Sequence, residues 1–186
     1  KYLPVNTTCI TEDLAESLLF GSCKGAYTGA IDKAGFFSEA NQGTLFFDEI
    51  ENLTPNLQAK LLRVIETHEF YKLGGTKKYS SDFRLICATN RDLQEMVDQG
   101  LFRLDLFYRL DVSHLIIPPL RQHKEDIGLL AYNYLKQTKK CLSQEALHLL
   151  CKYNWPGNVR ELFNCLERAV FEAKTSQVLF PQHFDI

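Results

Sequence analysis

The chain lacks the features of several classes of protein. None of its 186 residues belongs to an apolar run that approaches the roughly 18 needed to span a bilayer, and no segment reads as a signal peptide. The net charge is only −2, so no overall attraction to nucleic acid or anionic lipid is expected. A composition of 45% hydrophobic and 24% charged residues excludes disordered and collagen-like chains. We expect a globular protein without a membrane segment.

Paired or metal-spaced cysteines are also lacking. The six cysteines form no C-x-x-C pair and have no zinc-finger spacing with histidine. Cys87 lies within the apolar run Leu85–Ala88, and Cys165 lies within a helical pattern. We interpret the thiols as reduced and mostly filling the core, as in a cytoplasmic protein. They are Cys9, Cys23, Cys87, Cys141, Cys151 and Cys165.

Short apolar runs predict buried strands. They are nearly continuous rather than alternating, which is typical of a parallel sheet covered on both faces. Helical patterns separate them; in one, Thr54 is an N-cap before Pro55 at the first helical position. The alternation predicts an α/β fold. The four runs are Leu3 to Val5, Leu45 to Phe47, Leu85 to Ala88 and Leu115 to Ile117.

The pattern changes after Pro118-Pro119. Stripes of apolar residues at helical spacing follow, and Ser143 is placed to cap one of the helices. Asn158 with Glu161 three residues later resembles a capping box. The sequence therefore predicts an α/β part over residues 1–119 and a small helical part over residues 120–186.

Two acids follow one of the predicted strands. Asp48 and Glu49 end the apolar segment that begins at Gly43, which is a Walker B pattern. Ligands of open α/β sheets bind beyond the carboxyl ends of the strands. There an aspartate can hold Mg²⁺, and a glutamate can polarise a water for attack on a γ-phosphate. The alternative is a pair of solvated acids, or acids that cap the next helix.

Small polar residues follow a second predicted strand. Thr89 and Asn90 come directly after Leu85–Ala88. If the two strands are parallel neighbours, Asn90 lies beside the acids and its amide can orient water or a phosphate oxygen. A lone asparagine at a strand end is more often only a turn residue.

A small-residue loop carries one aromatic side chain. The segment is Gly25-Ala26-Tyr27-Thr28-Gly29-Ala30. It is not a phosphate-binding loop, because the glycine spacing is wrong and Gly-Lys-Ser/Thr is missing. The loop is either a mobile connection whose tyrosine packs locally or a contact loop with an aromatic anchor.

Three arginines are candidates for an anionic partner. Arg103 and Arg109 are six residues apart, about 240° of helical rotation, so one surface and one interface arginine are expected. Arg160 falls in the first turn of a predicted helix, where a cation opposes the helix dipole. Because this placement is unfavourable, it is weak evidence that Arg160 binds an anionic ligand.

Taken in order, these segments resemble the AAA+ domain of the sigma-54-dependent transcription activators of the NtrC type. The resemblance runs from Leu3 to about Ala173, nearly the whole chain. Its most specific element is the loop Gly25–Ala30, which matches the family signature GAFTGA with tyrosine for phenylalanine. The other matching segments are Gly43–Ile50, Leu57–Val64, Ala88–Asn90, Phe102–Leu110, Pro118–Arg121 and Trp155–Leu162.

The resemblance implies an AAA+ fold of the P-loop NTPase type, with a helical lid, that binds ATP and Mg²⁺. By similarity, Asp48 binds the magnesium ion and Glu49 is the catalytic acid. Asn6 matches an asparagine that holds the glutamate off line until the partner engages. Thr89 and Asn90 match the sensor I residues, with Asn90 near the nucleotide.

The resemblance also implies partners. Arg103 and Arg109 match arginines that reach the nucleotide of a neighbouring subunit in a hexameric or heptameric ring, and Arg160 matches the sensor II arginine of the lid. The loop Gly25–Ala30 would contact sigma-54 RNA polymerase, supported by a second loop that includes Leu73–Thr76. In this family ATP hydrolysis remodels the closed promoter complex, and DNA is bound by a separate domain.

Several positions depart from the family pattern. Tyr27 adds a hydroxyl at an apolar contact, where it must find a partner or stay wet. Leu19 replaces a usual glutamate, and Ser22 and Cys23 replace a usual His-Glu pair before the loop. We expect Tyr27 to weaken the coupling to sigma-54, and the changes at Leu19, Ser22 and Cys23 to affect the relay between the nucleotide and the loop.

The pattern G-x-x-x-x-G-K-[ST] occurs nowhere in the chain. In the family this loop and a strand precede the segment that matches Leu3, and that strand lies between those matching Leu85 and Leu115. We therefore expect a fragment that alone neither binds ATP tightly nor hydrolyses it. The alternative to a piece of an ATP-dependent activator is a truncated AAA+ interaction module that docks partners but has no catalytic activity. The loop Gly25–Ala30 argues against other AAA+ remodellers, such as chelatase or clamp-loader relatives.

Overall fold

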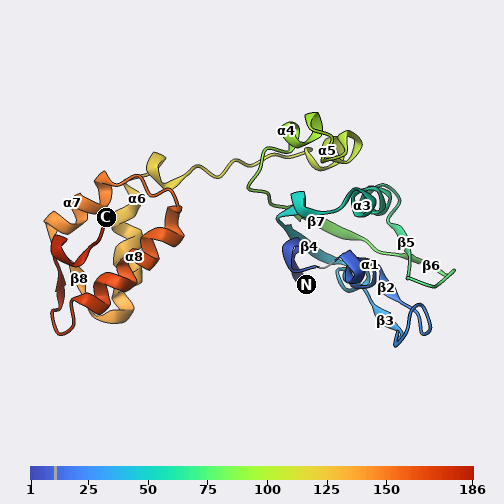
Figure 1. Ribbon diagram of the computed structural model, residues 1–186, viewed down its shortest axis with the longest axis horizontal. Coiled ribbons are helices and arrows are strands. Elements are labelled where there is room, and N and C mark those ends of the chain that lie inside the picture. Colours follow the sequence, from blue (N-terminus) through green and yellow to red (C-terminus); the bar gives the residue numbers. More distant parts are fainter. Residues whose placement is uncertain (11) are drawn as a thin grey trace. The chain divides into compact units, whose positions relative to one another are not determined.

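The computed structural model describes residues 1–10 and 12–186, which form two units with separate cores. Unit 1 comprises residues 1–114 and unit 2 comprises residues 115–186. Figure 1 labels most of the main helices and strands of both. The α/β character of the first unit and the helical character of the second agree with the fold class predicted from the sequence.

Unit 1 is built on a parallel sheet of three strands. They are β1 (Tyr2–Asn6), β4 (Gly43–Asp48) and β7 (Phe83–Cys87), with β4 in the centre. Leu3 lies opposite Leu45, which in turn lies opposite Leu85. Three of the four predicted strands are confirmed.

Helices and short hairpins complete unit 1. Thr54 has the extended backbone of an N-cap and Pro55 takes the first helical position, as predicted, although the Thr54 hydroxyl makes no capping bond. The helices are η1 (Thr7–Cys9), α1 (Glu12–Phe20), α2 (Phe36–Glu39), η2 (Ile50–Asn52), α3 (Pro55–Thr67), α4 (Leu93–Asp98) and α5 (Leu104–Leu110). The remaining strands are β2 (Gly21–Ser22), β3 (Lys33–Ala34), β5 (Glu69–Tyr71) and β6 (Lys78–Ser80).

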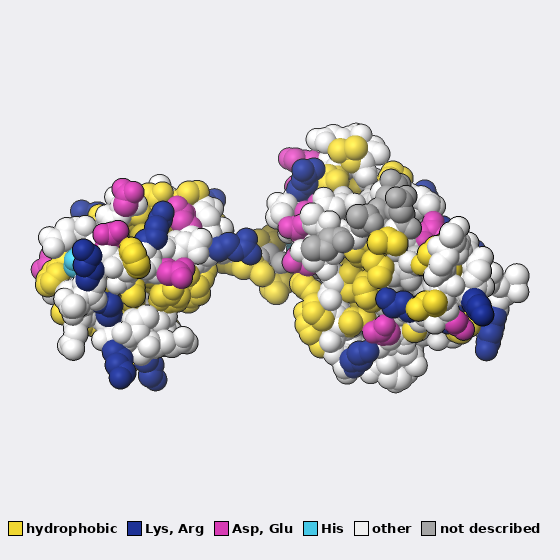
Figure 2. Space-filling view, turned by 60° about the horizontal axis from the view of Figure 1, so that its bottom comes forward, with side chains coloured by type: hydrophobic (Ala, Val, Ile, Leu, Met, Phe, Trp, Pro, Cys, Tyr) yellow, Lys and Arg dark blue, Asp and Glu magenta, His cyan; other side chains and the backbone are white. Residues whose placement is uncertain are grey.

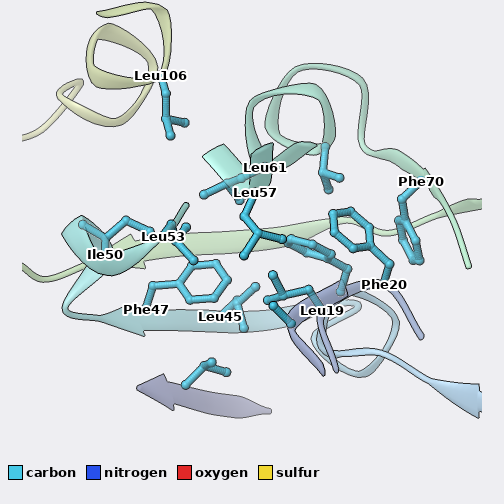
Figure 3. Close-up of a cluster of buried hydrophobic side chains, with 14 of the residues drawn as sticks. Leu19, Phe20, Leu45, Phe47, Ile50, Leu53, Leu57, Leu61, Phe70 and Leu106 are labelled. Carbon is cyan, nitrogen blue, oxygen red and sulfur yellow. The ribbon is translucent and has the colours of Figure 1, made fainter. Parts of the chain in front are cut away.

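The core of unit 1 lies on one face of the sheet. Leu45 and Phe47 of β4 point toward Leu57 and Leu61 of α3 (Figure 3), and all four side chains are buried. On the other face, Tyr2 is 59% and Ile86 39% exposed. The prediction of a sheet covered on both faces is therefore wrong for the described part of unit 1. Both faces of the strands carry apolar residues, and hydrophobic period alone does not reveal how many of these faces are packed.

The segment Leu115–Ile117 was expected to be a buried strand, and this prediction is also wrong. Its three side chains are 84%, 77% and 84% exposed, among the apolar side chains that Figure 2 colours yellow by type. A strand is stable only when a neighbouring strand accepts and donates its backbone hydrogen bonds. Among the described residues, no strand pairs with this segment.

Unit 2 consists mainly of α6 (Asp126–Leu135), α7 (Gln144–Lys152) and α8 (Asn158–Glu172). The predicted stripes are confirmed: α6 buries Ile127, Ala131 and Leu135, and Ser143 accepts a hydrogen bond from the Ala146 amide at the start of α7. Shorter elements are η3 (Leu120–Gln122), η4 (Lys136–Thr138), β8 (Cys141–Leu142), β9 (Val178–Leu179) and η5 (Pro181–His183).

The start of α8 differs from the predicted capping box. The cap residue is Gly157, whose amide donates to the Glu161 carboxylate at 2.8 Å. The Asn158 side chain instead accepts a hydrogen bond from the Leu120 amide at 2.9 Å. Asn158 has a positive φ of 54°, which asparagine tolerates better than most residues, so its side chain faces the η3 turn rather than its own helix.

The cysteines partly fulfil the prediction of core fillers. Cys165 is buried in α8, and burial raises the pKa of the Cys87 thiol to about 12. Cys141 is exposed, contrary to a core role, and the side chain of Cys9 lies outside the described part of the structure. No helix among the described residues is both long and apolar enough to cross a bilayer.

Candidate functional site

The carboxyl ends of the three parallel strands meet at one edge of the sheet. Asn6 at the end of β1 lies opposite Asp48 at the end of β4. Beyond the strands, the Ala88 amide donates to the Phe47 carbonyl at 2.8 Å, and the Ile50 amide donates to the Ala88 carbonyl at 3.1 Å. The segments after β4 and β7 thus run side by side, because the two strands are parallel neighbours.

Glu49 turns the chain sharply at this edge. Its φ of 57° and ψ of 48° are left-handed, a conformation that costs a non-glycine residue roughly 1–2 kcal/mol. The buried hydroxyl of Thr7 donates to the carbonyl of Asp48 at 3.1 Å and to the carbonyl of Glu49. These bonds hold the backbone turn, and strained residues of this kind cluster at functional sites.

The Glu49 carboxylate is held by two neighbours. Both the Thr8 hydroxyl and the Asn52 side-chain amide, the latter at 3.3 Å, donate to Oε2 of Glu49. The Asn52 amide also donates to the Thr8 hydroxyl at 3.2 Å. Asn6 accepts from the Thr8 amide at 2.9 Å, so it shapes the turn that carries Thr8 and reaches Glu49 through that residue.

Asn90 and Thr89 lie on the adjoining segment. The Asn90 amide donates to Oε1 of Glu51 at 3.4 Å, while its side chain is exposed. The Thr89 hydroxyl bonds the backbone of Arg91 and so forms a local turn. Glu51 is 6% exposed, and its Oε2 is buried with no partner among the described residues.

Thr8, Asn52 and Glu51 are site residues that the sequence pattern does not indicate. They are polar residues near strand ends, and nothing in their spacing separates them from ordinary turn residues. Only the parallel register of β1 and β4 brings Thr8 to Glu49, across 41 residues of chain.

The carboxylate oxygens at this edge of the sheet can supply some, but not all, of the ligands of a hard cation. Carboxylate oxygens suit Mg²⁺, which commonly takes one or two protein carboxylates and completes its shell with water and phosphate oxygens. Asp48 can supply one such ligand. Among the side chains that the structure describes, those of residues 1–8, 10 and 14–186, no group of three His, Cys, Asp or Glu could hold a metal ion, so a site held by protein groups alone does not fit there.

The two arginines of the α5 region are both exposed. Arg103 is the residue before α5 rather than part of it, so the predicted helical rotation between Arg103 and Arg109 does not apply. Its amide donates to the buried Gln58 side chain at 2.9 Å, and its guanidinium pairs with Asp105 at 2.6 Å. This pairing raises the pKa of Arg103 and lowers the pKa of Asp105. In unit 2, Arg160 lies exposed in the first turn of α8.

The loop Gly25–Ala30 stands on the short β2–β3 stem. The Ala30 amide donates to the Tyr27 carbonyl at 2.9 Å, and the Gly25 amide donates to the Ala30 carbonyl at 3.4 Å. Gly25 and Gly29 have φ of 85° and 83°, values that favour glycine. The loop therefore closes on itself and leaves Tyr27 46% exposed.

Comparison with known proteins places both units in families. The sigma-54 interaction domain family matches residues 1–116, and the AAA+ ATPase lid domain family matches residues 121–185. The regulatory protein AtoC of Escherichia coli is 49% identical over 91% of the chain and 38% of its own length. The phenol regulator MopR of Acinetobacter guillouiae is 46% identical over the whole chain and 35% of its own length. The chain thus spans about a third of the length of these relatives.

Solved structures agree with the sequence relatives. NtrX from Brucella abortus in complex with ATP superposes with a TM-score of 0.89 at 31% identity, covering the whole chain and 44% of that protein. Hsp104 has a TM-score of 0.67 at 21% identity over 91% of the chain and 34% of its own, which supports the AAA+ fold alone. The chain therefore belongs to the sigma-54 interaction domain family of NtrC-type activators and has an AAA+ fold with its lid.

Proposed function

We propose that this chain is part of the ATPase domain of a sigma-54-dependent activator, which couples ATP binding and hydrolysis to remodelling of the sigma-54 RNA polymerase closed complex. The observation that carries the proposal is the exposed Tyr27 on a loop closed by its own hydrogen bonds. An exposed aromatic side chain on a small-residue loop is a suitable anchor for a protein partner. NtrX, a structural relative, has been solved with ATP, which supports a nucleotide ligand.

The acids at the sheet edge divide the chemistry between them. Asp48 would hold Mg²⁺, which neutralises phosphate charge when bound. Glu49 would orient a water and take its proton at a carboxylate oxygen. The Thr8 and Asn52 side chains both donate hydrogen bonds to Oε2 of Glu49. Oε1 would therefore be the oxygen that accepts a hydrogen bond from the water.

The arginines would complete the site in an assembly. Arg103 and Arg109 lie exposed around α5 and would reach the nucleotide of a neighbouring subunit in a hexameric or heptameric ring. An arginine supplied in trans contributes about 10³ to 10⁵ in rate. In unit 1, Asn90 and the Thr89 turn would contact the nucleotide. Arg160 of the lid would bind the nucleotide as the sensor II arginine does in the family. DNA would be contacted by a separate domain.

The test of the partner assignment uses the complete encoded protein and purified sigma-54. Binding is measured with an ATP transition-state analogue present, for wild type, Tyr27→Ala and Tyr132→Ala. Tyr132 is a suitable control because it is exposed and lies on α6, outside the loop and outside the segment that carries Arg103 and Arg109. Loss of binding in Tyr27→Ala alone supports the proposal, and unchanged binding in that variant contradicts it.

A non-catalytic interaction module is the second candidate, favoured by one observation. The sequence holds no G-x-x-x-x-G-K-[ST] segment, whose backbone amides and lysine bind phosphates in P-loop proteins. Nucleotide titration of the complete protein separates the two candidates. Saturable ATP binding that is followed by hydrolysis supports the ATPase, whereas sigma-54 binding without any nucleotide binding supports the module.

A further inference from the structure

The segment after β5 is tied to the base of the loop that presents Tyr27. Leu73 pairs with Ser22 in a parallel bridge. The Cys23 amide donates to the Leu73 carbonyl at 3.0 Å, and the Leu73 amide donates to the Gly21 carbonyl at 2.9 Å. Backbone hydrogen bonds therefore join the β5–β6 hairpin to the first strand of the loop stem, β2.

Lys72 extends this connection to the opposite side of the loop. Its Nζ lies 2.5 Å from Oδ1 of Asp32, the residue directly before β3. The Lys72 side chain is only 11% exposed, and its ammonium lies 5.3 Å from the centre of the Tyr79 ring. A lysine so enclosed has few alternative positions, so its charge is fixed where Asp32 can meet it.

Two glycines allow the hairpin to approach the loop closely. At Gly74, which has a φ of 73°, an added Cβ would lie 2.6 Å from the Cβ of Ala26. At Gly75 an added Cβ would lie 2.7 Å from Sγ of Cys23. Larger residues do not fit at either position without movement, so the hairpin packs directly on the first half of the loop.

We propose that Lys72 is a positioning residue for the loop Gly25–Ala30. The backbone bonds of Leu73 hold the loop at β2, and the ion pair with Asp32 holds it just before β3. With both sides fixed, the loop keeps one position relative to the β5–β6 hairpin, and the position of Tyr27 depends on the hairpin. The consequence for sigma-54 rests on the proposed function, but the positioning itself does not.

The positioning is tested by amide hydrogen exchange in the full chain without any partner. In Lys72→Met, exchange across residues 23–32 is expected to rise about fivefold, the effect of losing one partly enclosed ion pair. Lys78→Met is the matched control, because Lys78 pairs with Glu69 on the same hairpin and 55% of its side chain is exposed. Equal exchange in wild type and Lys72→Met overturns the proposal.

A double-mutant cycle shows whether the pair itself acts. Lys72→Met, Asp32→Asn and the double variant are expected to raise exchange to the same level, because each removes one interaction. Additive increases overturn the proposal, since they mean that Lys72 and Asp32 act separately on the loop.

The functional consequence is read separately, as sigma-54 binding by the complete protein with the transition-state analogue. Lys72→Met is expected to weaken binding about threefold to tenfold, while Lys78→Met leaves it unchanged. If Tyr27→Ala has no effect on binding, the proposed function fails, yet the exchange result still decides the role of Lys72. If Tyr27→Ala abolishes binding and Lys72→Met does not weaken it, the positioning role in partner contact is overturned.

Discussion

The hydroxyl of Thr8 donates to the carboxylate of Glu49, although 41 residues separate them in the chain. The parallel register of β1 and β4 brings them together, and Asn52 donates to the same oxygen. A carboxylate that must direct a water depends on such neighbours for its orientation, because small misplacements cost large factors in rate. Thr8 therefore contacts the Glu49 carboxylate directly. The Asn6 side chain instead accepts a hydrogen bond from the Thr8 amide.

Replacing Thr8 by valine is expected to lower kcat for ATP in the complete protein about tenfold. Valine has the same shape but no hydroxyl, so Oε2 of Glu49 loses one donor. Thr8→Ser keeps the hydroxyl and is expected to retain the wild-type kcat. Steady-state turnover measures all three, and an unchanged or raised kcat in Thr8→Val contradicts an orienting role.

Replacing Glu49 by glutamine is expected to slow ATP hydrolysis in the complete protein by about 10² to 10⁴, because the amide cannot take a proton from water. Nucleotide affinity, measured by titration, is expected to stay within about threefold of wild type, since the shape of the side chain is kept. If Glu49→Gln hydrolyses ATP at the wild-type rate, Glu49 is not the catalytic base.

Replacing Tyr27 by phenylalanine is expected to strengthen sigma-54 binding. The hydroxyl of an exposed tyrosine must find a polar partner or remain wet when it meets an apolar surface, and phenylalanine removes this requirement. The expected gain is a few-fold in Kd, measured with the transition-state analogue. A weaker complex would show instead that the hydroxyl makes a hydrogen bond with the partner.

Replacing Leu162 by alanine is expected to lower the free energy of unfolding of unit 2 by about 2–5 kcal/mol, because the leucine is fully buried in α8. Trp155 is the single tryptophan of the chain and is buried in the same core, so its fluorescence during urea unfolding follows unit 2. Phe171→Ala on the same helix is the control. Its side chain is 81% exposed, and a change within about 0.5 kcal/mol is expected.

Cys87 makes stability depend on pH in the alkaline range. Burial raises the pKa of its thiol from 9.0 to about 12, so between these values the folded chain keeps a proton that the unfolded chain releases. The free energy of unfolding therefore falls as pH rises through this window. Urea unfolding at pH 8 and pH 10 is expected to show a larger loss in wild type than in Cys87→Ala. Equal losses would mean that the thiol is not buried from solvent.

The sequence by itself determined the α/β and helical units, three parallel strands, the stripes of the helices, and the position of the acids at a strand end. These depend on local patterns: apolar runs, capping residues and the period of each helix. The tertiary structure decided which polar side chains meet, because the register of β1 on β4 places Thr8 against Glu49 and the bridge at Leu73 places Lys72 against Asp32. It also decided that Leu115–Ile117 is no strand in the described chain, since an apolar run becomes a strand only where a neighbouring strand completes its hydrogen bonds.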